Sequence, residues 1–484
     1  MPDGTCAYQG GSVKRLLLDS RNRTRVILAA ALCLPLMVPL SVAHADEDTG
    51  SQRVENYVQP VNADTFTLTE LQRPEGLERL QTLQTPQALA AVLPHEVSGP
   101  AKSSAPRAEE NSVQPLNEDR STSAAAATDA AAVSLPEPAH TMTLQECVAG
   151  LVGSEFYVKS RYAVCSGRQF GQVWIKNGTP VGESHFDVVV VGTIPKNSRE
   201  MTATYYYTDF TVEGSTDARE LGVTTKASVS HSSPATAQFT TGGNSLPATR
   251  KWAELLDGIP VKQTLTAPSG QPGWAGSLRG ISAIYQPNIK LVAPPGWSSG
   301  AFTGGDIFML PPRWDEASYL NASTAGGAAV FSVLATLKYS TADAAPEREV
   351  AKHIQKAFTK PTQTQPPLAT KRLAGQNADE PLTRLYTDTE RRGKNRTRAV
   401  WNCVKFFGPN YADGGKECDE FPFATTYQGA AGYEYDPLQD PLNFSVMALD
   451  GESNGAAGTL LGQFYTLNRI IDGPDDGFIV KITS

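Results

Sequence analysis

Apolar and polar side chains alternate with a period of two through the middle of the chain, from about residue 140 to residue 345. Successive side chains of a β-strand point to opposite faces of the sheet, so this pattern predicts strands with one buried face. The strand candidates lie between turns rich in Gly, Pro, Asn and Ser, at 171–175, 186–191, 201–212, 281–291 and 331–340. We therefore predict a β-rich, sandwich-like middle domain at 140–345.

A helical period replaces this alternation at three places. A weak leucine repeat over residues 68–93 indicates a short helix. The segment 346–368 opens with Pro346 and acidic residues and carries lysines later, which predicts a helix followed by a linker. After a strand at 444–448, apolar residues recur at helical spacing up to Ile471. The last 116 residues, 369–484, thus predict a small α+β domain.

The first 45 residues have the pattern of a secretory signal peptide. Basic residues precede an apolar run at 26–42, and Ala43-His44-Ala45 provides a site for cleavage after Ala45. The apolar run is shorter than the roughly 20 residues that span a bilayer, and Pro35 and Pro39 interrupt it. We therefore expect a secreted protein, released from a bacterial cell, without a stable membrane anchor.

Residues 46–139 differ in composition from the rest of the chain. Ala, Ser, Thr, Pro, Gln and Glu dominate there, and aromatic residues are scarce. Such a segment buries too little apolar area to offset the entropy lost on ordering. The composition predicts a disordered spacer or pro-segment, and the whole chain is expected to be multidomain.

Four cysteines remain after removal of the leader: Cys147, Cys165, Cys403 and Cys418. An even number in an oxidising compartment predicts two disulfides. Three pairings are open, and the one that joins near neighbours in sequence gives Cys147 with Cys165 and Cys403 with Cys418. A zinc site is the alternative, but it needs CxxC or Cys/His spacing, which these cysteines lack.

Charge restricts how the chain contacts a nucleic acid. The formal net charge is −8, so any phosphate contact has to be local. A basic segment supplies candidates for DNA binding, namely Arg391, Arg392, Lys394, Arg396 and Arg398. The alternative is an ordinary solvated helix face.

Two adjacent acids, Asp419 and Glu420, follow the basic segment within the string 418–429. Consecutive carboxylates in a strand point to opposite faces, and Pro422 indicates that the strand ends there. Farther on, a glycine-rich stretch around Asn454 precedes the predicted helix. The positive end of such a helix suits a phosphate or a metal-bound phosphate.

The string from Cys418 to Tyr427, followed by Asn454 to Gly458 and an amphipathic helix, closely resembles the NucA/NucB deoxyribonucleases. The resemblance covers 369–484 and implies Asp419 as the general base. Its neighbour Glu420 is the second catalytic candidate. The resemblance also implies Asn454 beside a catalytic Mg²⁺ or Mn²⁺ ion, with Gln463 as a second polar residue at a one-residue offset. In place of a Glu common in that family, the chain has Gln428, which lowers the local negative charge.

Phosphodiester hydrolysis needs an activated water and a cation on the phosphate. No histidine follows His353. We therefore expect a carboxylate base rather than a histidine in 369–484. The predicted function is secreted, metal-dependent, non-specific DNA cleavage. The alternatives are a catalytically inactive nuclease-like binding or adhesion protein and a phosphodiesterase that acts on RNA.

The β-rich region shows no catalytic motif, and we expect it to bind a cell wall, another polymer or a partner. Four tryptophans lie in its Gly- and Pro-rich second half: Trp252, Trp274, Trp297 and Trp314. They offer an aromatic binding surface as one interpretation, but aromatic side chains more often fill cores. We predict that they pack inside.

Overall fold

The computed structural model describes residues 52–61, 63–83, 133–151, 154–274, 278–300, 302, 304–320 and 327–484. These residues all fall within one compact unit, Thr49–Ser484. The predicted signal peptide, its cleavage after Ala45 and the low-complexity part of the spacer lie outside them. Among the described helices, none has the length and apolar character that a membrane crossing requires.

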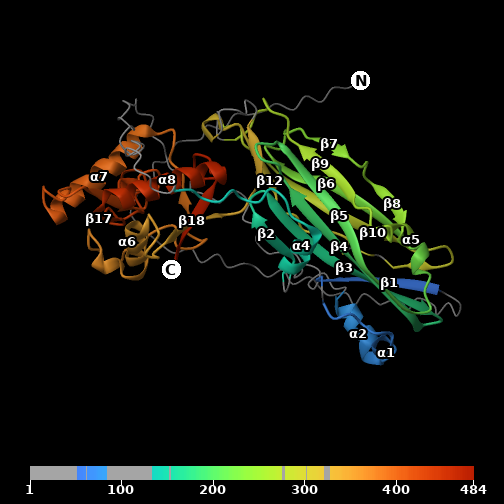
Figure 1. Ribbon diagram of the computed structural model, residues 1–484. Coiled ribbons are helices and arrows are strands. Elements are labelled where there is room, and N and C mark those ends of the chain that lie inside the picture. The colour runs from blue at the N-terminus through green and yellow to red at the C-terminus, as the bar shows by residue number, and fades with distance from the viewer. Residues whose placement is uncertain are drawn as a thin grey trace, which may run out of the picture. The chain divides into compact units, whose positions relative to one another are not determined.

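The chain is β-rich, as the alternation predicts, and its largest sheet has eight strands. Their order is β11-β1-β3-β4-β5-β9-β7, with β2 paired to β3. The bounds are β1 Gln52–Gln59, β2 Phe156–Ser160, β3 Ala163–Lys176, β4 Thr179–Thr193, β5 Glu200–Gly214, β7 Thr240–Gly243, β9 Val261–Thr266 and β11 Ser298–Ser299. The long neighbouring strands β3, β4 and β5 curl together in Figure 1.

A second sheet of five strands has the order β13-β12-β10-β6-β8. Its strands are β6 Gly222–Ser233, β8 Ala248–Lys251, β10 Ile281–Val292, β12 Pro312–Asp315 and β13 Ala328–Phe331. Side chains from both sheets form one core, in which Phe186 and Val188 of the first sheet join Ile281 and Tyr285 of the second. Burial of apolar area between the sheets is the main force that holds them together.

The tryptophans pack as predicted. Trp252, Trp297 and Trp314 are buried in the core shared by the two sheets. Trp274 is partly buried in a smaller cluster around Leu320. None of these four indoles supplies a broad aromatic surface for a polymer.

The predicted disorder from residue 46 onward is wrong for residues 52–61 and 63–83. Strand β1 pairs with β3 over its whole length, from Gln52 opposite Lys176 to Gln59 opposite Gln169. The short helices α1 (Leu68–Leu71) and α2 (Pro74–Leu83) follow, in the region of the predicted helix. The polar composition of a long window hides this strand, because its burial comes from pairing with a strand 110 residues away.

The C-terminal part of the chain is built from β14 to β18 and three helices. Two small sheets, β14-β18-β15 and β16-β17, lie beside α6, α7 and α8. The bounds are β14 Ala335–Ser340, α6 Arg348–Thr359, β15 Leu382–Thr383, α7 Thr389–Phe407, β16 Lys416–Phe421, β17 Ser445–Asp450, α8 Gly451–Leu467 and β18 Gly477–Thr483. The remaining short elements are α4 Leu144–Gly150, α5 Trp252–Leu255, η2 Ala218–Glu220, η4 Ser318–Leu320, η5 Pro361–Gln363 and η6 Gly432–Glu434.

The boundary expected at 346–368 does not match the strand pairing. The predicted strand 331–340 divides into β13, which joins the second sheet, and β14, which pairs in parallel with β18. The predicted helix is present as α6, and it packs in the same core as β14, α8 and β18. One continuous alternation runs through both strands, which is why the sequence pattern conceals the change of sheet. We name residues 335–484 the C-terminal region.

Both disulfides form as predicted. Cys147 of α4 is bonded to Cys165 of β3, and Cys403 of α7 is bonded to Cys418 of β16. Disulfides persist in oxidising compartments, so the two bonds are compatible with a secreted protein.

A buried network of ion pairs joins the β-rich sheets to the C-terminal region. Asp315 of β12 accepts two hydrogen bonds from Arg469, at 2.6 and 2.9 Å, and pairs with Arg313 at 3.0 Å. Asp476 pairs with Arg313 at 3.1 Å and with Arg161 at 2.7 Å. All five side chains are buried. We name these five residues the arginine–aspartate network.

A buried acid in the large sheet predicts a pH-dependent stability. Burial raises the pKa of Asp187 to about 6, with Asp209 adding to the shift. Because this pKa lies above the value of about 3.9 in the unfolded chain, folded-state stability falls as the pH rises from about 4 through about 6.

We expect Asp187→Asn to remove this loss, so that the variant gains about 1–3 kcal/mol over the wild type at pH 8 but much less at pH 4. Urea unfolding at the two pH values measures the difference. The control is Glu200→Gln, whose parent side chain is exposed on the neighbouring strand β5. An equal gain at both pH values would contradict the prediction.

Candidate functional site

The predicted motif residues lie on a strand–strand–helix unit. Strands β16 and β17 pair antiparallel, with Asp419 opposite Met447 and Glu420 opposite Val446. Strand β16 ends at Phe421, directly before Pro422, as the sequence indicated. Helix α8 then begins at Gly451 without an intervening loop. The two strands and the helix place the two acids and Asn454 in one short unit.

The N-terminus of α8 is already capped by the chain itself. The Asp450 carboxylate accepts hydrogen bonds from the backbone N–H groups of Glu452 and Ser453, both at 3.0 Å. From the sequence, N–H groups at this end of the helix are expected to bind a phosphate. The cap therefore stabilises the helix and leaves phosphate binding to side chains.

The two adjacent acids of β16 point to opposite faces, as the period of a strand requires. Asp419 contacts α6 through His353, whereas Glu420 contacts α7 through Arg396. Cys418 shares the face of Glu420 and is bonded to α7. A single bound phosphate would therefore meet only one of the two carboxylates directly.

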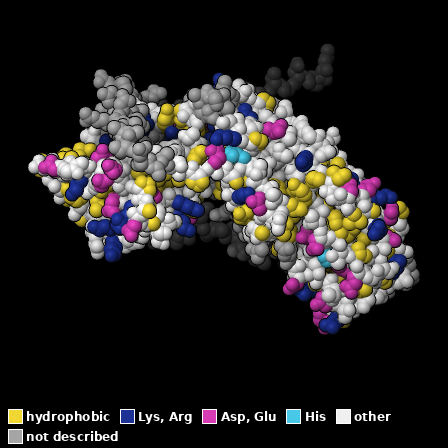
Figure 2. Space-filling view, in the orientation of Figure 1, with side chains coloured by type: hydrophobic (Ala, Val, Ile, Leu, Met, Phe, Trp, Pro, Cys, Tyr) yellow, Lys and Arg dark blue, Asp and Glu magenta, His cyan; other side chains and the backbone are white. Residues whose placement is uncertain are grey.

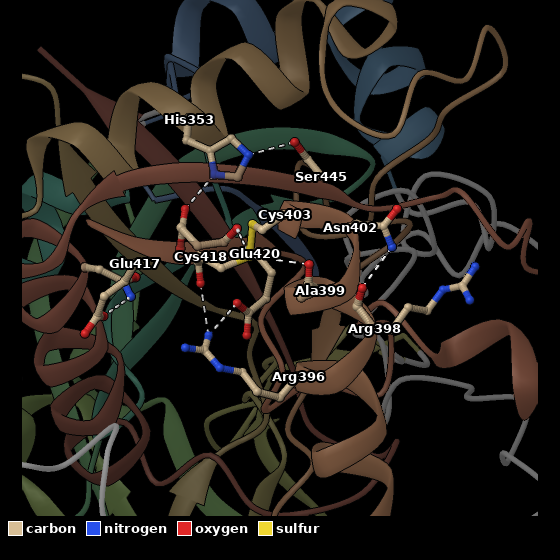
Figure 3. The surroundings of a disulfide bond; sticks show 12 residues. His353, Arg396, Arg398, Ala399, Asn402, Cys403, Glu417, Cys418, Glu420 and Ser445 are labelled. Carbon is tan, nitrogen blue, oxygen red and sulfur yellow. Dashed lines mark hydrogen bonds and ion pairs between the residues drawn. A yellow bond between two sulfur atoms is a disulfide. The ribbon is translucent and has the colours of Figure 1, made fainter. Parts of the chain in front are cut away.

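Asp419 is held in a linear array with a histidine and a serine. His353 Nδ1 lies 2.5 Å from Asp419 Oδ2, and His353 Nε2 lies 2.7 Å from Ser445 Oγ. All three residues are buried: His353 is 2 % exposed, Asp419 6 % and Ser445 0 %. Figure 3 shows the His353 ring between Ser445 and strand β16.

From the sequence, no histidine is expected at the site, because none follows His353 in the chain. The structure nevertheless places His353 itself against Asp419. The predicted helix in 346–368 includes His353 but lies outside the predicted nuclease domain at 369–484; in the structure α6 belongs to the same core as α8 and brings the His353 ring onto Asp419. A signal was present in the sequence. His353 lies three residues after Val350 and four before Ala357, so it belongs to the buried stripe of the helix.

The pKa of Glu420 lies near neutral pH. Burial raises its pKa to about 7, although the guanidinium of Arg396 opposes the shift. Arg396 Nη1 donates to Glu420 Oε2 at 2.8 Å and to the carbonyl oxygen of Cys418 at 3.1 Å. A carboxyl group with such a pKa can accept or donate a proton at neutral pH.

Asn454 contacts an acid that the motif did not single out. Its Nδ2 donates to Glu417 Oε2 at 2.7 Å, and Glu417 is exposed two residues before Asp419 on the same face of β16. Sequence reasoning missed Glu417, although the period of two places it beside Asp419.

The donor atoms of Glu417 and Asn454 fit a divalent metal ion of the magnesium type. Mg²⁺ takes oxygen donors, often one or two carboxylates, and fills the remaining positions with water and substrate phosphate. Glu417 offers an exposed carboxylate, and Asn454, whose Nδ2 donates to that carboxylate, has an amide oxygen as the second donor. Over the described residues, no three His, Cys, Asp or Glu side chains converge into a preformed metal cage.

Gln463 lies apart from Asn454. Nine residues of helix separate them, about 13 Å along the axis of α8. The Gln463 side chain accepts from the Leu135 N–H at 2.8 Å and donates to the Val133 carbonyl at 2.9 Å. Both of its amide atoms thus hold the segment that precedes α4, and the structure does not bring Gln463 to the metal candidates.

Gln428 also has a structural partner. Its Oε1 accepts from the Thr383 N–H at 3.0 Å, and its Nε2 donates to Thr383 Oγ1 at 3.1 Å. The amide thereby fastens β15 to the loop after β16. Its contacts with Thr383 account for an amide at this position without reference to a metal.

The basic segment forms helix α7, and its cations contact protein groups. Arg391 is buried, with its guanidinium 4.0 Å from the ring centre of Tyr435, and it donates to the Tyr427 carbonyl. Arg398 donates to the Tyr433 hydroxyl at 3.0 Å. These two arginines fix the loop after β16 rather than face solvent.

The other cations of the segment are nearer the surface. Lys394 pairs with Glu390 at 3.4 Å and with Glu434 at 3.5 Å. Arg392 is half-buried, 5.5 Å from the ring centre of Tyr386. Only part of the predicted DNA-binding set is therefore accessible, and Arg396 is its half-exposed member beside Glu420.

A second row of cations lies on α6. Its members recur every four residues: Arg348, Lys352 and Lys356 in α6, and Lys360 directly after its last residue. The last two are exposed, and Figure 2 shows Lys and Arg side chains gathered in the region of α6. This row lies on the helix that also carries His353.

Comparisons of the chain with protein-family models, with curated proteins and with solved structures find no match. The resemblance of residues 418–458 to the NucA/NucB deoxyribonucleases stays a prediction from the sequence. Any assignment of function then depends on the side chains and their contacts.

Proposed function

We propose that the C-terminal region is a nuclease domain that hydrolyses phosphodiester bonds of DNA with a divalent cation, and that the protein does so outside the cell. One observation carries the proposal. On one face of β16 lie the buried carboxylate of Asp419, held by His353, and, two residues earlier, the exposed carboxylate of Glu417, which accepts a hydrogen bond from Asn454 Nδ2. A base and a cation site are the two groups that metal-assisted hydrolysis requires.

In this mechanism Asp419 accepts a proton from the water whose oxygen attacks phosphorus, the P–O bond to the leaving sugar oxygen breaks, and that oxygen takes a proton from solvent. Glu417 and Asn454 would hold Mg²⁺ or Mn²⁺, which supplies positive charge to the phosphate when bound. Glu420 faces α7, where it pairs with Arg396 on the opposite face of β16. It is the second candidate for the general base. The two acids therefore have separate partners, set by the alternation of β16.

Binding of DNA in this proposal is local and electrostatic. The chain has a net charge of −8, so the phosphates have to meet short rows of cations rather than a uniformly basic surface. Lys356 and Lys360 of α6 and Arg396 of α7 are the exposed or half-exposed candidates. The β-rich region is a positioning or partner-binding module in this proposal, and the arginine–aspartate network couples it to the nuclease domain.

The test uses the purified full chain with plasmid DNA. We expect cleavage with Mg²⁺ or Mn²⁺, complete loss after addition of a chelator, and recovery when excess metal is restored. Agarose gels over time measure the rate. Folded protein that cuts no DNA in any divalent metal would support the inactive binding protein instead, and cleavage of RNA alone would move the substrate to RNA.

A further inference from the structure

We propose that His353 is a positioning residue, which holds the Asp419 carboxylate in the orientation that accepts a proton from water. The inference rests on the proposed function and extends it to a residue of α6, outside the motif that carries the resemblance. It starts from the two contacts of the imidazole ring, one to Asp419 and one to Ser445.

The hydrogen-bond chemistry assigns the proton of the ring. An ionised carboxylate only accepts hydrogen bonds, so Nδ1 carries a hydrogen and donates to Asp419 Oδ2. In the neutral ring, Nε2 is then an acceptor, and the Ser445 hydroxyl donates to it. The Asp419 carboxylate therefore fixes the tautomer, and the Ser445 hydroxyl, which can donate or accept, holds the other side of the ring.

The ring is also fixed in space. Helix α6 buries Val350, Ile354 and Ala357 in the core of the C-terminal region. The Ser453 hydroxyl of α8 accepts a hydrogen bond from the Glu349 N–H at 3.2 Å. The imidazole thus comes from a helix anchored to α8, the helix that carries Asn454, and a rigid element holds a reacting group more precisely than a loop does.

His353 is not itself placed to act on a substrate. Its side chain is 2 % exposed, and both ring nitrogens have protein partners. It acts through Asp419, by restricting the side-chain rotation of the carboxylate. A misplacement of about 1 Å in a reacting group can cost about a hundredfold in rate.

Two substitutions separate the two ring contacts. The amide nitrogen of His353→Asn replaces Nδ1 and keeps a donor toward Asp419, whereas that of His353→Gln reaches the place of Nε2 and keeps only the contact with Ser445. We expect His353→Gln to lower kcat about a hundredfold with KM and affinity for DNA unchanged. His353→Asn should retain kcat within about tenfold of the wild type, since the loss of one hydrogen bond that supports a reacting group begins to cost about that much.

Cleavage kinetics and the melting temperature are measured for the full chain and both variants in the same metal. Equal losses in the two variants, unchanged kcat in both, or an increased KM in place of a decreased kcat would overturn the inference. Wild-type protein that cuts no DNA would overturn the proposed function, and the inference with it, before any variant is compared.

Ser445→Ala keeps His353 and covers the case in which a His353 variant fails to fold. Loss of the hydroxyl removes one of the two contacts that hold the imidazole ring against Asp419, so we expect a lower kcat at unchanged KM. An unchanged kcat in folded Ser445→Ala would overturn the inference by itself.

Discussion

Asp419→Asn should lose nearly all DNA cleavage while the protein keeps its fold and its affinity for DNA. The amide has the size of the carboxylate, and its oxygen still accepts from His353 Nδ1, so the array with Ser445 is preserved. What disappears is the proton acceptor. A positioned general base contributes about a hundredfold to ten-thousandfold, so kcat should fall by that factor. Steady-state cleavage of plasmid DNA and binding of DNA in the presence of chelator measure the two quantities.

Asp413→Asn is the matched control for this prediction. It makes the same change at an exposed acid in the loop before β16, and we expect wild-type rates. Near-wild-type cleavage by folded Asp419→Asn would refute the assignment of the base. Glu420, on the opposite face, would then be the candidate to replace.

The metal candidates should respond differently from the base. In Asn454→Ala the cation loses one of its proposed oxygen donors, whereas Asp419 is intact. Additional Mg²⁺ or Mn²⁺ should restore part of the rate in Asn454→Ala and none in Asp419→Asn, because mass action refills a weakened site but cannot supply a base. A titration of metal against cleavage rate compares the two variants, and equal rescue would contradict the division of roles.

Much of the local structure could be predicted from the sequence. The period of two indicated β4, β5, β10 and the end of β3 but not β6, and the change to a helical period indicated α8 after β17. The opposite orientation of Asp419 and Glu420 follows from strand geometry alone. The disulfide partners lie 18 and 15 residues apart, so the pairing of near neighbours was sufficient.

Long-range pairing was the part that sequence pattern could not supply. Strand β14 pairs with β18 across about 140 residues, and this pairing brings α6 into the C-terminal core. Without it, His353 looked remote from Asp419. The accessibility of the predicted DNA-binding residues could not be predicted for a related reason. The charge along a helix does not reveal that Tyr435 and Tyr433 lie over Arg391 and Arg398.

Asp315→Ala should destabilise the protein by about 3–5 kcal/mol, because it breaks a buried ion pair and leaves its partners uncompensated. Asp315 is 0 % exposed and accepts from both Arg313 and Arg469. After the substitution, Asp476 is the remaining acid of the arginine–aspartate network, opposite three arginines. The cost therefore comes from stranded guanidinium charge more than from one lost contact.

A surface pair provides the control for this prediction. Asp343 pairs with Arg348 at 2.7 Å, but its side chain is 93 % exposed, so Asp343→Ala should cost no more than about 1 kcal/mol. Urea unfolding, followed by tryptophan fluorescence and by loss of DNA cleavage, measures both variants. Because Asp315 belongs to β12 and Arg469 follows α8, the two signals should shift together in Asp315→Ala. A loss of less than 1 kcal/mol, or a shift in only one signal, would mean that the network does not couple the β-rich sheets to the C-terminal region.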